Sequence, residues 1–155
     1  MPKKDASNYE MLQDNRGPAI NNKLHLPAWL RAWGPAIVWM GVLVYLSSQQ
    51  HLPQPPDPLL NTIIRKGGHM GAFGLLALFY HRGLSHAKVS GTTLSYGAWF
   101  LTALYAASDE WHQGFTPGRE PTVMDWGIDM TGATLALVLQ FLWQRRFAQA
   151  ESKAQ

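Results

Sequence analysis

Hydrophobic residues are concentrated in four runs along the chain, and polar segments separate these runs. The runs are WGPAIVWMGVLVYLSS (33–48), HMGAFGLLALFYHRGL (69–84), TTLSYGAWFLTALYAAS (92–108) and GIDMTGATLALVLQFLW (127–143). Each contains 16 or 17 residues, whereas a helix needs about 20 residues to cross the hydrocarbon core of a bilayer. Because helices continue beyond their apolar centres, the pattern predicts an all-α integral membrane protein, built as a bundle of four transmembrane helices.

The segments outside the runs are polar and define the predicted domain boundaries. Residues 1–28 are predicted to form a polar cytoplasmic tail, residues 29–148 a single membrane domain, and residues 149–155 a short cytoplasmic C-terminal tail. A chain of 155 residues has the size of one domain. The polar tails explain why the mean hydropathy is only −0.14, although charged residues make up just 15% of the sequence.

Basic residues predict the orientation in the membrane. Most of the 13 Lys and Arg residues fall in the two tails or between the second and third runs: Lys3, Lys4, Arg16, Lys23, Arg31, Arg82, Lys88, Arg145, Arg146 and Lys153. Since cytoplasmic segments carry an excess of Lys and Arg, both termini are predicted to lie in the cytoplasm, and the protein to be a multi-pass protein of the inner membrane. Acidic residues fall mainly on the opposite, outer side.

Local signals predict where two of the helices begin. Asp57 is followed by a proline, the combination preferred at an N-cap and the first helical position, so the second helix is predicted to begin there and to carry KGGH (66–69). A helix start at Pro121 would put Asp125 and Asp129 in the first turns of the fourth helix, where the helix dipole favours carboxylates.

Small residues recur at spacings that allow two helices to approach closely. They are Gly67, Gly71, Gly74, Gly132 and Ala136. We expect them to pack helices together rather than to bind a ligand.

Polar side chains from four segments gather at the predicted outer ends of the helices. They are Lys66, His69, Asp109, Glu110, His112, Gln113, Arg119, Asp125 and Asp129. Residues four positions apart on a helix are separated by about 40°, so Asp109 shares a face with Gln113, and Asp125 with Asp129. Charges at this depth are costly unless they face the bundle interior and pair, and they mark a functional site by default.

Three blocks within this cluster resemble the VanZ-like family of membrane proteins. KGGH (66–69) is similar to the family's K-x-x-H, DEWHQGFTPGR (109–119) to its D-E-x-x-Q-x-F-x-P-G-R, and DWGIDMTG (125–132) to its D-x-x-x-D/N-x-x-G. The blocks occur in the family's order, and the resemblance extends over all four runs. Ala72 and Phe73 depart from it, since an acidic residue and a tyrosine often follow the family's histidine, and Asp129 stands where asparagine is common.

The resemblance implies a small integral membrane protein with four helices. The founding member of the family is associated with resistance to the lipoglycopeptide teicoplanin in Gram-positive bacteria. The resemblance therefore links the chain to the cell envelope and to resistance of this type. It implies no particular reaction, so whether the chain is an enzyme stays open at this stage.

The polar cluster is interpreted as a site at the outer membrane face that binds or processes a lipid-linked or cell-envelope anion. Asp109, Glu110 and Asp125 are the candidate catalytic residues, acting as general acid or base. The candidate ligand-binding residues are Lys66, His69, Gln113, Arg119 and Asp129. Arg119 would clamp a phosphate or carboxylate with its planar guanidinium group, and paired carboxylates would suit Mg²⁺. No organic cofactor is indicated, and the expected partners are membrane lipids and a lipid-linked envelope precursor.

Two other classes of function fit the same residues. In the first, the chain is a structural or interaction protein, and Lys66 and Arg119 neutralise the carboxylates to hold the helices in register. In the second, it is a small transporter subunit, which would require a homo-oligomer because four short helices are few for a pathway. A polar chain that continues to the inner face would favour transport.

Histidines and overall composition complete the expectations. His112 follows Asp109 at a helical spacing that suits metal ligands, and His69 could join them across the bundle, although hydrogen bonding is the commoner role. His81 and His86 are assigned to the cytoplasmic loop.

The chain has no cysteine, which excludes disulfides and thiolate metal sites. A pI near 9.3 comes from scattered basic residues without a basic helical stripe, so nucleic acid is not an expected partner.

Overall fold

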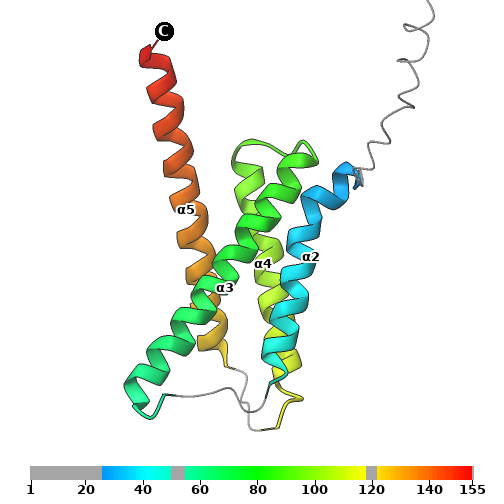
Figure 1. The fold of residues 1–155 in the computed structure, drawn as a ribbon, viewed down its shortest axis with the longest axis vertical. Helices are drawn as coiled ribbons and strands as arrows, with labels where there is room; N and C mark the ends of the chain where they lie inside the picture. The colour runs from blue at the N-terminus through cyan, green and yellow to red at the C-terminus, as the bar shows by residue number, and fades with distance from the viewer. Residues whose placement is uncertain (1–25, 50–54, 118–121, 155) are drawn as a thin grey trace, which may run out of the picture.

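The computed structural model describes residues 26–49, 55–117 and 122–154, and these residues form four helices and no strand. The helices are α2 (Ala28–Ser47), α3 (Pro58–His86), α4 (Gly91–Gln113) and α5 (Val123–Ala154) (Figure 1). Each hydrophobic run lies almost wholly within one helix, and every helix extends beyond its run, as predicted. The all-helical class is thus confirmed for this part of the chain. Residues 1–25 of the predicted N-terminal tail lie outside it, whereas α5 continues through the predicted C-terminal tail.

The two ends of α3 follow from local signals. Asp57 is the N-cap, and its carboxylate accepts a hydrogen bond of 2.8 Å from the Leu60 N–H, as the sequence predicted. At the other end, Lys88 adopts a left-handed φ of 62°, and the Val89 N–H donates to the Leu84 carbonyl at 3.1 Å. This is the Schellman arrangement, which ends a helix by turning the backbone away from its axis.

α5 begins at Val123 rather than at the predicted Pro121, which lies outside the described residues. The hydroxyl of Thr122 accepts a hydrogen bond of 3.0 Å from the Asp125 N–H. Thr122 is therefore the cap that starts the helix. Asp125 lies in the first turn, as predicted, and Asp129 lies one turn further on.

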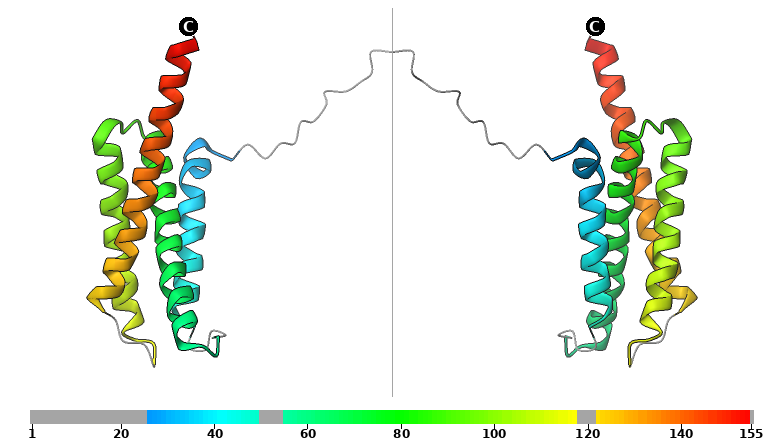
Figure 2. Two further views of the ribbon diagram at one scale, coloured as in Figure 1. Left: turned by 90° about the vertical axis from the view of Figure 1, so that its left-hand side faces the viewer. Right: turned by 90° about the vertical axis from the view of Figure 1, so that its right-hand side faces the viewer.

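The helices run alternately in opposite directions, and α3 lies at the centre of the bundle. It contacts each of the other three helices, whereas α2 and α5, as far as they are described, do not contact each other. The first residues of α2 and the last residues of α5 lie at the same end (Figures 1 and 2). The last turns of α5 extend past the other helices there. The ends of α2 and α4 lie at the opposite end, with the starts of α3 and α5.

Small residues let α3 and α5 cross in direct backbone contact. A Cβ placed on Gly132 of α5 would collide with the carbonyl oxygen of Met70 in α3. A Cβ on Gly74 would lie 3.0 Å from the Gly132 carbonyl oxygen and 3.3 Å from the Ala136 Cβ. The predicted packing role is therefore confirmed for Gly74, Gly132 and Ala136, which bring the two backbones together.

A second close contact joins α2 to α3 toward the other end of the bundle. The Trp33 ring covers Gly83 so closely that a Cβ on this glycine would lie 2.7 Å from the ring. Gly67 and Gly71 differ from these positions, because a Cβ on either would meet nothing within 4 Å. The packing prediction is wrong for these two glycines, which face open space.

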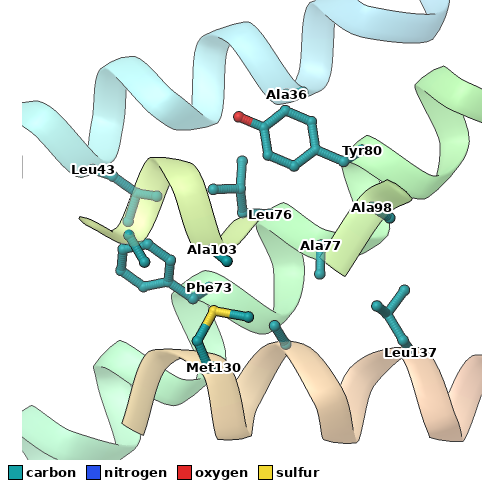
Figure 3. Close-up of a cluster of buried hydrophobic side chains, with 12 residues drawn as sticks. Ala36, Leu43, Phe73, Leu76, Ala77, Tyr80, Ala98, Ala103, Met130 and Leu137 are labelled. Carbon is teal, nitrogen blue, oxygen red and sulfur yellow. The ribbon is translucent and has the colours of Figure 1, made fainter. Parts of the chain in front are cut away.

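Small side chains line the interior of the bundle, and many large apolar side chains lie on its outside. Among the described residues, seven of the 13 buried hydrophobic ones are alanines. Larger core residues such as Phe73, Leu76, Met130 and Leu137 come mainly from α3 and α5 (Figure 3). Exposed large apolar side chains include Ile37, Val38, Tyr45, Phe100, Leu104, Val138, Leu139 and Leu142. This distribution reverses the usual relation between core and surface in a water-soluble bundle.

Length and composition alone identify α2 as able to cross a membrane. This helix of 20 residues is long and apolar enough to cross a bilayer, and no other helix in the described ranges meets the same standard. The other helices carry polar groups near their ends, for example Lys66 and Arg82 in α3 and Asp109 and Glu110 in α4. The residues of the candidate site therefore lower the hydropathy of the helices that hold them.

Candidate functional site

Three buried carboxylates lie where α4 ends and α5 begins. Asp109 and Glu110 are in the last turns of α4, and Asp129 is in the second turn of α5; their exposed fractions are 5%, 8% and 0%. Each has one oxygen with no hydrogen-bond partner within the described parts of the chain: Oδ1 of Asp109, Oε1 of Glu110 and Oδ2 of Asp129. We refer to these three atoms as the unpaired oxygens. A buried polar atom without a partner is unfavourable, so this arrangement costs stability.

Asp129 is paired with His69 of α3. The distance from His69 Nδ1 to Asp129 Oδ1 is 3.1 Å, so a proton on Nδ1 is donated to the carboxylate. This contact depends on the helix crossing, because His69 adjoins Met70, whose carbonyl touches Gly132. The His69 ring also stacks against Phe73, with ring centroids 6.4 Å apart and planes 8° from parallel. The ring is thus held between an apolar neighbour and a buried acid.

Asp109 is held by a residue one turn further along α4. Gln113 Nε2 donates a hydrogen bond of 2.8 Å to Oδ2 of Asp109. Both side chains are buried, so the predicted shared face of Asp109 and Gln113 is observed and faces the interior. The amide satisfies one oxygen of the carboxylate and leaves the other as an unpaired oxygen.

Glu110 connects the end of α4 to the start of α5. Its Oε2 accepts a hydrogen bond of 3.0 Å from the backbone N–H of Thr122, the residue that caps α5. Glu110 lies beyond the apolar run 92–108, and burial raises the pKa of its carboxyl. The Thr122 N–H opposes this rise in pKa, while the charges of Asp125, Asp129 and Asp109 add to it. The four carboxylates are therefore close enough to act on one another electrostatically.

Two other predicted residues, Lys66 and His112, are not part of this group. Lys66 is half-buried on α3 and forms no ion pair with any described acid. His112 is exposed on α4. Arg119 lies outside the described residues. Within the described ranges, the one ion pair is that of His69 with Asp129.

The geometry gives no support to a metal site. In residues 26–49, 55–117 and 122–154, no three His, Asp or Glu side chains converge in a way that would hold a metal ion. The proposed Mg²⁺ site and the alternative pairing of His69 with His112 on a metal therefore have no basis in the described side chains.

An open pocket of about 340 Å³ adjoins Glu110 between α4 and α5. It is lined by Ala107, Glu110, Trp111, Thr122, Val123 and Trp126. The Trp126 indole N–H donates to the Ala103 carbonyl at 3.2 Å, which fixes one wall of the pocket. The pocket thus places a buried carboxylate at the edge of a largely apolar surface.

A comparison with protein families identifies the family to which this arrangement of helices and carboxylates belongs. The family model described as VanZ/LLP1 matches residues 32–144. The chain belongs to the VanZ/LLP1 family. No curated protein and no solved structure matches it. The matched region contains α2 from Ala32 onward, the whole of α3 and α4, and α5 up to residue 144. It includes every residue of the candidate site, so the predicted family resemblance is confirmed.

Two features of this VanZ/LLP1 chain were not predicted from the sequence. Thr122 caps α5 and holds Glu110; the sequence signal was the spacing Thr-x-x-Asp from Thr122 to Asp125, which is typical of a helix start. His81 was assigned to the cytoplasmic loop, and this assignment is wrong. It lies within α3 with 8% of its surface exposed, and its Nδ1 is 3.1 Å from Nε2 of Gln140 in α5.

Proposed function

We propose that the chain is a four-span protein of the inner membrane with both termini in the cytoplasm. We further propose that its buried carboxylates recognise the headgroup of an anionic, lipid-linked molecule of the cell envelope. The observation that carries the proposal is the set of three unpaired oxygens on Asp109, Glu110 and Asp129. Membership of the VanZ/LLP1 family supports a membrane setting.

The distribution of large and small side chains supports four spans. Helices in a bilayer associate through small residues, because lipid tails already surround the large apolar side chains. The chain follows this pattern at the crossing of α3 and α5, where Gly74 and Gly132 bring the backbones together. Exposed residues on three helices, such as Val38, Phe100 and Leu139, offer apolar surface to lipid.

The ends of the helices support the proposed orientation. α2 begins and α5 ends at one end of the bundle (Figure 1), and the basic residues of this end are Arg31, Arg82, Lys88, Arg145 and Arg146. An excess of Lys and Arg is typical of the cytoplasmic side. The buried carboxylates lie at the other end, which is then the outer face.

The unpaired oxygens favour a particular class of ligand. A carboxylate accepts hydrogen bonds, so the part of a ligand that meets Asp109, Glu110 and Asp129 should carry donors such as sugar hydroxyl, amide or ammonium groups. The apolar pocket beside Glu110 would take an adjoining lipid segment. Lys66 and Arg119 are the basic residues proposed to bind the phosphate of such a molecule.

Binding is tested with a polyprenyl phosphate-linked disaccharide added to the purified protein in detergent. We expect it to raise the thermal midpoint of the wild type, since a ligand at roughly 100 times its Kd stabilises by about 2.7 kcal/mol. Asp109→Asn and Asp129→Asn should remove most of this shift. Asp57→Asn is the matched control, because Asn caps α3 as well as Asp does. Equal shifts in all four proteins would contradict the proposal.

Processing of the ligand is a separate part of the proposal. Glu110, with its raised pKa, is suited to donate a proton in a reaction at the headgroup, with Asp109 and Asp125 beside it. Radiolabelled lipid followed by thin-layer chromatography tests this: Glu110→Gln should abolish product even at lipid concentrations high enough to saturate the variant. Without product in the wild type, the chain is a binding protein. A role in the envelope should also appear as altered susceptibility to teicoplanin when the chain is expressed.

The two alternative functions have less support. A register-setting network of ion pairs would use Lys66, which pairs with no described acid. A transport pathway would need polar groups from Asp129 to the His81–Gln140 pair. Among the buried residues of α3 and α5 between them, Tyr80 carries a hydroxyl, which donates to Met40 Sδ. The others are apolar: Phe73, Gly74, Leu76, Ala77, Met130, Gly132, Ala133 and Leu137.

A further inference from the structure

A second pocket lies at the end of the bundle opposite the carboxylates. Its volume is about 440 Å³, and it is lined by Ala28, Arg31, Ala32, Arg82, Ser85 and His86. These residues come from the first turns of α2 and the last turns of α3, which meet at one end of the bundle (Figure 1). The volume lies within the range of pockets that hold small molecules. We refer to it as the basic pocket.

Two features of the structure fix the shape of the basic pocket. The ring of Trp33 is seated on Gly83, which holds α2 and α3 together directly beside it. In addition, Arg82 Nη2 donates a hydrogen bond of 3.2 Å to the backbone carbonyl of Arg31. This bond draws the Arg82 guanidinium across from α3 to α2. Two guanidinium groups and a histidine are thereby gathered in one depression.

No acidic residue neutralises this pocket in the described segments around it. Residues 26–49, 79–99 and 140–150 contain no Asp or Glu, and the first turn of α2 contains none. The carboxylates described above all lie at the other end of the bundle: Asp57, Asp109, Glu110, Asp125 and Asp129. Arg31 and Arg82 form no ion pair within the described chain, so both guanidinium groups are available to an anion.

We propose that the basic pocket binds the phosphate headgroup of an anionic phospholipid from the membrane leaflet at this end. Basic pockets between helices on the cytoplasmic side are suited to such headgroups, and guanidinium groups bind phosphate through paired N–H donors. Trp29, with 57% of its surface exposed in the first turn of α2, is placed to contact the interfacial part of the lipid. This inference shares only the membrane-spanning arrangement with the function proposed above.

The test measures phosphatidylglycerol binding to the purified full-length chain by native mass spectrometry and by thermal midpoint. Phosphatidylcholine and inorganic phosphate are run in parallel. Arg31→Gln combined with Arg82→Gln should weaken phosphatidylglycerol binding about tenfold or more, as expected for the loss of charged hydrogen bonds. Arg145→Gln combined with Arg146→Gln removes the same charge from the same end outside the pocket and should leave binding within about twofold.

Several results would overturn this proposal. Equal weakening in the two double variants would show a general charge effect, and equal binding of phosphatidylcholine would exclude recognition of an anion. A thermal shift by inorganic phosphate as large as that by phosphatidylglycerol would make free phosphate the ligand. If the pocket variant does not fold, Arg31→Gln alone serves, because only the backbone of Arg31 makes the bond to Arg82. Glu110→Gln should retain phosphatidylglycerol binding, which separates this test from that of the outer site.

Discussion

The side chain of His69 in α3 lies 3.1 Å from that of Asp129 in α5, and Asp129 is completely buried. The pair links two helices across 60 residues of sequence and stands directly beside the backbone contact of Met70 with Gly132. Close backbone packing and a buried ion pair therefore occur at the same place, so substitutions of either should change the stability of the protein.

His69→Leu should destabilise the protein by about 3 kcal/mol, because it leaves the buried Asp129 carboxylate without a partner. Replacing both residues by leucine should recover most of this loss, since an apolar pair of similar volume carries no buried charge. His112→Leu is the control, because His112 is exposed at the same end of the bundle. Thermal midpoints in one detergent provide the measurement. A double variant as unstable as the single one would show that the ion pair is not responsible.

Gly132→Ala should lower the free energy of unfolding by about 1–3 kcal/mol or more, because its Cβ meets the Met70 carbonyl and the backbone must move. Gly71→Ala adds the same methyl group to α3 in open space. It should raise stability by about 0.5–1 kcal/mol, since alanine favours a helix over glycine. Chemical unfolding of both variants tests the contact. Opposite signs are expected, and a loss of stability in both would argue against this explanation.

Glu110→Gln should preserve or raise the thermal midpoint at neutral pH. The pKa of Glu110 is raised in the folded protein from the ordinary value of 4.5, so the folded state binds more protons than the unfolded state in this interval. Stability of the wild type then falls as pH rises from about 4.5 through the raised pKa. The variant lacks this pH-dependent loss. The thermal midpoints of the wild type and of Glu110→Gln should therefore move apart as pH rises through this range. Parallel curves for the two proteins would contradict a raised pKa of Glu110.

The proposed four-span orientation is tested with single cysteines, because the natural chain has none. Pro117→Cys follows the carboxylate end of α4, and Ala87→Cys follows α3 at the opposite end; both positions are exposed. A membrane-impermeant maleimide added to intact spheroplasts should label Pro117→Cys. Ala87→Cys should react only after the membrane is opened. Labelling of both cysteines in intact spheroplasts would contradict four spans with cytoplasmic termini.

Local and periodic signals predicted much of this fold. Four apolar runs corresponded to four helices, Asp57 capped α3, and Asp109 shared a face with Gln113, because each depends on residues close in sequence. The family motifs also identified the relevant carboxylates. Their effect on one another depends on the contact of α4 with α5.

Contacts between distant segments were harder to predict. Sequence spacing alone treated Gly71 and Gly74 alike, although the crossing of α3 on α5 brings only Gly74 against Gly132. In the same way, His81 was assigned to the cytoplasmic loop, whereas it lies within α3 and Gln140 meets it from α5. The pairing of His69 with Asp129 rather than with His112 likewise depends on which face of α3 is turned toward α5.

Separation of basic and acidic residues gives the described chain a permanent electric dipole along the bundle. In the proposed orientation its positive end lies in the cytoplasm and its negative end outside. A resting membrane potential, negative inside, acts on this dipole in the favourable direction, at up to about 2.3 kcal/mol per charge that crosses 100 mV. The membrane potential should therefore stabilise the proposed orientation through the charges of Arg31 and Arg82 at one end and of Asp109 and Asp129 at the other.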